Sequence, residues 1–121
     1  MNIAKRVCMA AVIGLLGVAP VLADCAYPKA PADPPNGAKA TQDEMVAAMK
    51  ATRQFDADVK AYQACLDSDT EAMLNALGAK ATAEEIKRIK DKQVLKANTA
   101  FEEAAKVAAA FNVELRAFKA K

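Results

Sequence analysis

Apolar residues recur every three or four positions along two long blocks of the chain, residues 41–77 and 82–119. This spacing is typical of helices that pack along one apolar stripe. Neither block is interrupted by glycine or proline, so each can continue as one helix over its whole length. The pattern therefore predicts two long helices, over 41–77 and 82–119, joined by a turn at 78–81.

Polar residues at the ends of the two blocks support these limits. Thr41 stands three residues before Glu44, and Thr82 stands three residues before Glu85, which is the capping-box pattern of a helix start. Gly78 is a suitable C-terminal cap for the first helix, because glycine adopts the left-handed conformation that often ends a helix.

The short connection between the predicted helices makes them antiparallel neighbours, each about 55 Å long at 1.5 Å per residue. Facing residues should lie at equal distances from about residue 80. We therefore expect an all-α fold, a long antiparallel two-helix hairpin that resembles a coiled coil. The expected apolar pairs are Met45 with Leu115, Met49 with Phe111, Val59 with Phe101, Leu66 with Val94, and Leu74 with Ile86.

Residues 24–40 differ in composition from the blocks that follow. They hold Pro28, Pro31, Pro34 and Pro35, followed by the Asn-Gly turn signal at residues 36 and 37. Proline favours an extended, polyproline-like backbone and removes a hydrogen-bond donor. We expect residues 24–40 to form an extended arm.

Residues 1–23 have the pattern of a secretory signal peptide. Lys5 and Arg6 form a positive start, an apolar segment follows, and small residues precede Asp24. The apolar run is short for a membrane span of about 20 residues. We therefore expect cleavage after Ala23, a periplasmic or secreted mature chain, and no stable membrane insertion after cleavage.

The three cysteines fall on both sides of this cleavage site. Cys8 would leave with the leader, so Cys25 and Cys65 would remain in an oxidising compartment. We interpret them as a structural disulfide that staples a folded-back arm to the middle of the first helix. Two alternatives stay open at this point: a bridge between two chains, and a lipid attached to Cys25.

Charge and composition limit the classes of partner. The full chain has 17 basic and 15 acidic residues, and the two basic residues of the leader account for the excess. A neutral mature chain provides no general field for nucleic acid, and we expect none to bind. Acidic residues gather in the first half and basic residues in the second. We expect Asp67, Asp69 and Glu71 to pair across the hairpin with Lys92, Lys90 and Arg88.

Some large apolar side chains do not fit the single seam between two helices. Four of them form a candidate interaction surface: Phe55, Tyr62, Val107 and Phe118. Either the arm covers them, or a homodimer forms in which two hairpins pair into a four-helix bundle, or they bind a client protein.

No residue set in the sequence supports catalysis. The chain has no histidine, and Ser68 is its single serine; no glycine-rich phosphate loop or nucleophile motif is present. Met45 and Met49 lie one turn apart and offer two thioethers that could bind Cu(I), but we interpret both as core residues. We therefore expect neither an enzyme nor a bound cofactor or metal.

Several short motifs resemble a group of uncharacterised small exported proteobacterial proteins. The shared features are a Cys/Pro-rich arm, the Ala-Thr-x-x-Glu-Met helix start at residues 40–45, and the Tyr-x-x-Cys-Leu motif at residues 62–66. The resemblance covers residues 24–67 and implies the arm, the disulfide and the helix start, with no active site. We expect an exported interaction or structural protein of the cell envelope. The alternative, suggested by the outline of periplasmic hairpin chaperones, is a holdase-type chaperone or inhibitor.

Overall fold

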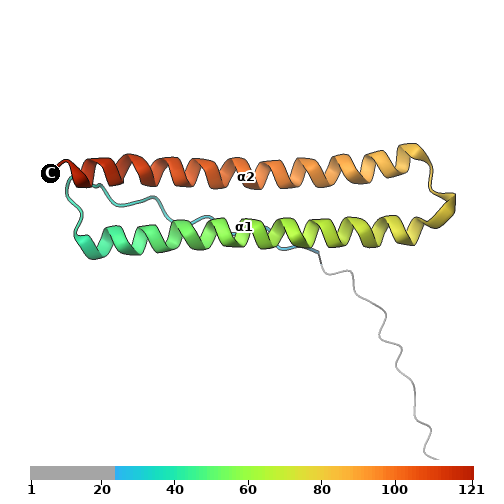
Figure 1. Cartoon of the computed structure of the whole chain (residues 1–121), viewed down its shortest axis with the longest axis horizontal. Coiled ribbons are helices and arrows are strands. Elements are labelled where there is room, and N and C mark those ends of the chain that lie inside the picture. The colour runs from blue at the N-terminus through green and yellow to red at the C-terminus, as the bar shows by residue number, and fades with distance from the viewer. Residues whose placement is uncertain (1–23) are drawn as a thin grey trace, which may run out of the picture.

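The computed structural model describes residues 24–121, and the predicted leader lies outside the described residues. Helix α1 spans Gln42–Leu77, a short 3-10 turn spans Gly78–Lys80, and helix α2 spans Ala83–Lys119. The two helices lie side by side and antiparallel, as Figure 1 shows. The described part is thus an all-α hairpin, which confirms the fold class expected from the sequence. Neither α1 nor α2 is long and apolar enough to cross a membrane.

Both helices begin with the capping boxes that the sequence predicts. The Thr41 hydroxyl accepts a hydrogen bond from the Glu44 backbone nitrogen at 3.2 Å, and the Glu44 carboxylate accepts one from the Thr41 backbone nitrogen at 2.7 Å. Thr82 and Glu85 repeat this arrangement. These bonds satisfy backbone donors that a helix start leaves without partners, and they lower the pKa of both glutamates.

Gly78 ends α1 as expected. It has a φ of 63°, and its backbone nitrogen donates to the Leu74 carbonyl oxygen. This left-handed conformation is easy for glycine and costly for other residues. The chain then turns within a few residues and enters α2, so the two helices become antiparallel neighbours.

Two hydrophobic clusters hold the helices together. The central cluster consists of the buried residues Phe55, Val59, Tyr62, Leu66 and Ala100. The end cluster, at the open end of the hairpin, consists of the buried residues Ala40, Met45 and Phe111, with Met49, Leu115 and Phe118 packed against it. The expected grouping of the two methionines with Phe111 and Leu115 is thus confirmed, and both thioethers belong to the core.

The expected pairing in the middle of the hairpin is wrong for two residues of α2. Phe101 and Val94 are exposed at 41% and 55%, and Ala100 is buried in their place. One residue along a helix is a rotation of about 100°, so burying Ala100 turns Phe101 out of the seam. The physical reason is space: Phe55 and Tyr62 fill the seam from α1, and an alanine opposite them lets the helices approach closely.

The expected ion pairs between the two helices are also absent from the described residues. The ion pairs that form there lie within single helices, Asp56 with Lys60 at 2.7 Å and Lys87 with Asp91 at 2.5 Å. Asp67 instead accepts a hydrogen bond from the Gln93 side chain. This bond confirms the alignment of the helices, because Asp67 and Gln93 are equally far from residue 80. Exposed ion pairs contribute little energy, so register does not depend on them.

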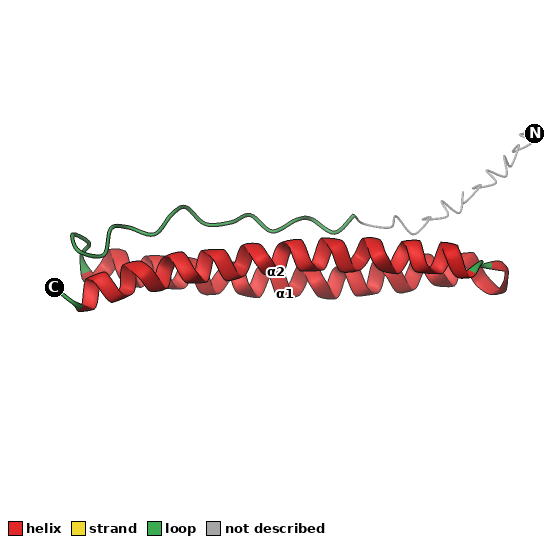
Figure 2. Cartoon of the chain, turned by 90° about the horizontal axis from the view of Figure 1, so that it is seen from above, coloured by secondary structure: helices red, strands yellow, loops and turns green. Residues whose placement is uncertain are grey.

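The arm, residues 24–40, runs along one side of the helical pair. Figure 2 shows it beside both helices, from near the middle of the hairpin to the open end, where it turns into α1. The turn forms at Asn36, whose carbonyl oxygen accepts bonds from the backbone nitrogens of Lys39 and Ala40. At this turn the Gly37 backbone nitrogen donates to the Glu114 carboxylate at 2.7 Å.

Gly37 allows the arm to approach the backbone of α2. A Cβ at this position would overlap the carbonyl group of Glu114 and lie 2.9 Å from the backbone nitrogen of Phe118. Backbone atoms of a helix cannot rotate away as a side-chain end can. The turn therefore requires glycine at this position, because only a residue without a Cβ can lie this close to the backbone of α2.

We expect Gly37→Ala to lower the free energy of unfolding by about 1–3 kcal/mol, the usual cost of forced overpacking. Thermal unfolding followed by helical circular dichroism measures this loss. Lys39→Ala, an exposed change in the same turn, is the matched control and should have little effect. Equal melting temperatures for the two variants would show that the arm does not need this close contact.

Candidate interaction surface

The arm covers much of the surface that the sequence offered for partners. Phe55 is 2% exposed and Tyr62 is 7% exposed, so neither is available to a partner while the arm is in place. Val107 is half-buried against the central cluster, and Phe118 is half-buried against the end cluster. Of the four residues predicted to form an interaction surface, Phe55 and Tyr62 are thus buried in this structure and Val107 and Phe118 are half-buried. Tyr62 is covered by Tyr27 of the arm, which is one of the three alternatives, whereas Phe55 lies in the central cluster between the helices.

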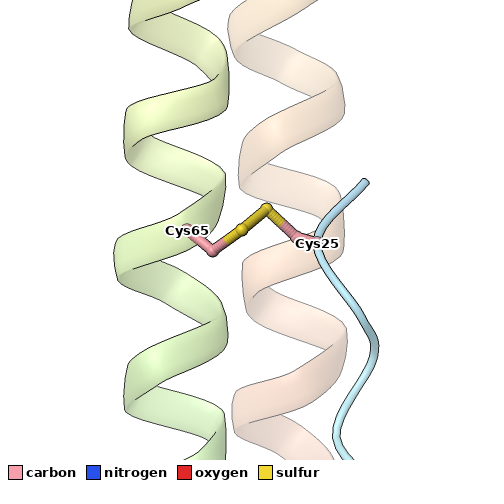
Figure 3. The surroundings of a disulfide bond; sticks show 2 residues. All are labelled: Cys25 and Cys65. Carbon is pink, nitrogen blue, oxygen red and sulfur yellow. A yellow bond between two sulfur atoms is a disulfide. The ribbon is translucent and has the colours of Figure 1, made fainter. Parts of the chain in front are cut away.

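A disulfide fixes the start of the arm to the middle of α1. Cys25 and Cys65 are bonded, with their Cα atoms 5.8 Å apart, which is within the usual range for a disulfide. Figure 3 shows the bond reaching from the arm to α1. The predicted staple is confirmed. In this structure both sulfur atoms are joined to each other within one chain.

Tyr27, two residues after the staple, ties the arm to both helices. Its ring meets the ring of Tyr62 edge-on, with centroids 5.3 Å apart. Its hydroxyl donates a hydrogen bond to the Glu103 carboxylate of α2 at 2.5 Å. The bond to Glu103, with smaller contributions from burial and from the negative charge, raises the pKa of Tyr27 to about 12.

The raised pKa predicts that the arm loosens in strong alkali. Folding favours the neutral phenol, so the contribution of this contact is complete below about pH 10 and is lost as the pH rises toward 12. The phenolate absorbance of the chain minus that of a Tyr27→Phe variant isolates the titration of Tyr27. We expect a midpoint near 12, and a lower midpoint in Glu103→Gln. A midpoint near 10 in the unaltered chain would contradict the contact.

The proline-rich stretch of the arm does not fill the groove beneath it. A pocket of about 410 Å³, partly open to solvent, is lined by this stretch and by both helices. Apart from Asp33, Glu44 and Thr52, its walls are proline, alanine and valine: Pro31, Ala32, Pro34 and Pro35 from the arm, Ala47, Ala48 and Ala51 from α1, and Val107 and Ala110 from α2. The arm is thus held firmly at its two ends, near Cys25 and near Gly37, and fits loosely between them.

The open end of the hairpin closes over the second anchor of the arm. The Lys121 ammonium donates to the Ala40 carbonyl oxygen and lies 4.3 Å from the centre of the Phe118 ring. Phe118, one of the predicted surface residues, is therefore packed from below by the end cluster and approached from above by a cation.

The hairpin beyond the staple has no such cover. We call this part, residues 66–99, the uncovered half, because the arm begins near the staple and runs from there toward the open end. Leu66 and Thr70 are buried there, but α2 has no buried residue before Ala100. Val94, Leu95 and Leu77 are exposed at 55%, 68% and 37%. Large exposed apolar side chains gathered on one part of a molecule are typical of an interaction site.

Phe101 extends this apolar surface on the side opposite the arm. Two residues along a helix are a rotation of about 200°, so Phe101 points away from Glu103 and the arm bound to it. Val94 lies two turns earlier on the same face of α2. The side of the hairpin away from the arm therefore carries exposed apolar residues along α2.

Two anchors of the arm could not be recognised from the sequence. Glu103 and Glu114 are ordinary helix glutamates in pattern, and only the folded arm gives them partners. The Asn-Gly pair at residues 36 and 37 predicts a turn, but it does not indicate that Gly37 lies against α2. In the described part of the chain, no group of three or more residues is placed to hold a metal ion. No family model, no curated protein and no solved structure matches this chain.

Proposed function

We propose that this chain is an exported interaction or structural protein of the cell envelope, without catalytic activity, and that it binds its partner through the uncovered half. The observation that carries the proposal is the unequal cover of the hairpin. The arm packs against the central cluster, whereas Val94 and Leu95, the two most exposed large apolar side chains among the described residues, lie beyond the staple. Water-exposed apolar area of this kind is stabilised when a partner covers it.

Export is supported by two features that arise separately. The leader pattern predicts passage out of the cytoplasm, and the Cys25–Cys65 disulfide is the kind of bond that persists in an oxidising compartment. The intact mass of protein purified from the periplasm tests both. A chain that begins at Asp24 and gains two hydrogen atoms on reduction supports export; a chain that keeps the leader, or carries a lipid, contradicts it.

Substitutions at exposed apolar residues test whether the uncovered half binds the partner. Val94→Ser, combined with Leu95→Ser, alters the uncovered half, whereas Val113→Ser alters a residue of similar exposure in the covered half. We expect the first variant to lose association, measured by light scattering and by binding of a client, with unchanged helical content. Equal loss in both variants, or in neither, would refute this surface.

The same measurements separate the two functional classes. A stable homodimer that binds no client favours a structural role, with two uncovered halves buried against each other. A monomer that binds a hydrophobic dye and suppresses the aggregation of an unfolded protein favours the holdase alternative. The exposed side chains of the uncovered half are compatible with both, and the first is proposed because the mature chain is neutral and carries no field that attracts a charged client.

A further inference from the structure

The arm is bound to the hairpin in the way that an extended peptide binds a receptor. No helix or strand forms in residues 24–36, and this stretch is held by contacts to the helices. Cys25 is joined to α1, Tyr27 contacts both helices, and Ala30 packs against the central cluster. Recognition of an extended proline-rich segment in a groove is a recurring mode of peptide binding. Here Tyr62 provides an aromatic contact to Tyr27, whereas alanine and valine lie opposite the prolines.

The groove has more room than the arm uses. The pocket of about 410 Å³ that Pro31, Pro34 and Pro35 line is bounded on the helix side by small residues. A peptide with larger apolar side chains at these positions would fill space that the arm leaves empty. The groove is therefore shaped for a class of extended, proline-containing segments, of which the arm is one member.

The arm is held at its first end by a disulfide, a bond that a dithiol can reduce. Both cysteines are half-buried in this structure. One thiolate of the dithiol attacks the disulfide and its second thiolate resolves the mixed disulfide, which leaves Cys25 and Cys65 as thiols and the dithiol oxidised. The two capping boxes and the end cluster do not involve either cysteine.

We propose that the arm is a releasable ligand held in cis, and that the groove it occupies binds an extended proline-rich peptide in trans once the Cys25–Cys65 disulfide is reduced. This surface lies on the arm side of the hairpin and is separate from the uncovered half. A tethered arm still competes, because a short linker gives an effective concentration in the millimolar range. Reduction makes that competition reversible, whereas the disulfide makes it permanent.

The test uses a labelled synthetic peptide with the sequence of residues 25–36, carrying Cys25→Ser. It is titrated into the full mature chain before and after treatment with dithiothreitol, and binding is followed by fluorescence anisotropy. We expect saturable binding to the reduced chain with at least tenfold higher apparent affinity than to the oxidised chain. A Tyr27→Phe peptide should bind several-fold more weakly, because it cannot donate to Glu103. A scrambled peptide of the same composition should not bind.

A double variant, Cys25→Ser with Cys65→Ser, separates arm release from other effects of the reductant. It should bind the peptide without dithiothreitol and show no response to it. Helical circular dichroism is recorded alongside, and loss of the helical signal on reduction overturns the proposal, because the groove would not outlast the staple. Equal binding before and after reduction, or equal binding of the scrambled peptide, also overturns it.

Two further outcomes bear on the proposal. A dimer of the reduced chain that the peptide fails to dissociate would place the arm of a second copy in the groove, and would overturn peptide binding in trans. The variant with Val94→Ser and Leu95→Ser should bind the peptide unchanged after reduction. Because these residues carry the proposed partner surface, failure of one proposal can be told apart from failure of the other.

Discussion

Replacing Phe55 with alanine should destabilise the fold by about 3–5 kcal/mol, the usual cost of removing a fully buried phenylalanine. Phe55 is 2% exposed and packs with Val59 and Tyr62 in the central cluster. The neighbours contributed by α2 at this level are mainly alanines, which have no flexible side chain to move into the space. Urea unfolding followed by helical circular dichroism gives the free energy of unfolding for each variant.

Phe101→Ala is the matched control for this experiment. It removes the same side chain from a position that is 41% exposed, so we expect a loss within about 1 kcal/mol. A large difference between the two phenylalanines supports the observed rotation of α2. Similar losses would mean that Phe101, as the sequence pattern suggested, lies in the seam after all.

Loss of the disulfide should lower the free energy of unfolding about as much as the Phe55→Ala substitution. With Cys25→Ser and Cys65→Ser together, we expect the free energy of unfolding to fall by about 4 kcal/mol on the chain-entropy model, because the bond closes a loop with a sequence separation of 40. For a domain of this size such a loss lowers the melting temperature by about 20 °C. Thermal unfolding with and without reductant measures it.

Two controls define the outcome. Ala64→Ser adds a hydroxyl at an exposed position next to Cys65 and should leave the melting temperature nearly unchanged. Reductant should lower the melting temperature of the unaltered chain and leave that of the double serine variant as it is. A double variant as stable as the original chain would show that the arm contributes nothing to the stability of the hairpin.

The features that could be predicted from the sequence depend on neighbouring residues. Both capping boxes, the glycine that ends α1 and the antiparallel course of the helices follow from local hydrogen bonding and from a connection too short for any other arrangement. An even cysteine pair and the reach of the arm favour the staple. These contacts form in much the same way whatever packs on the hairpin afterwards.

The choice of buried residues in α2 could not be predicted in the same way. Ala100 and Phe101 are adjacent apolar residues, and a helical pattern allows either one to face the partner helix. Which of the two faces the partner helix depends on three segments that pack together: α1, α2 and the arm. Phe55 and Tyr62 occupy the seam from α1, the arm adds a third layer over them, and the space that remains fits an alanine.

The same distinction holds for the candidate surface. The sequence contains more large apolar residues than one seam between two helices can bury, among them Phe55, Tyr62, Val107 and Phe118. It does not specify which part of the chain, or which partner, covers them. The helices, their caps and their antiparallel pairing follow from the amino-acid sequence, because short-range bonding and chain connectivity specify them, whereas the sequence left the pairing of Cys25 with Cys65 as one interpretation among several. The burial of Phe55 and Tyr62 and the exposure of Val94 and Phe101 depend instead on how α1, α2 and the arm share one limited space, which no local pattern specifies.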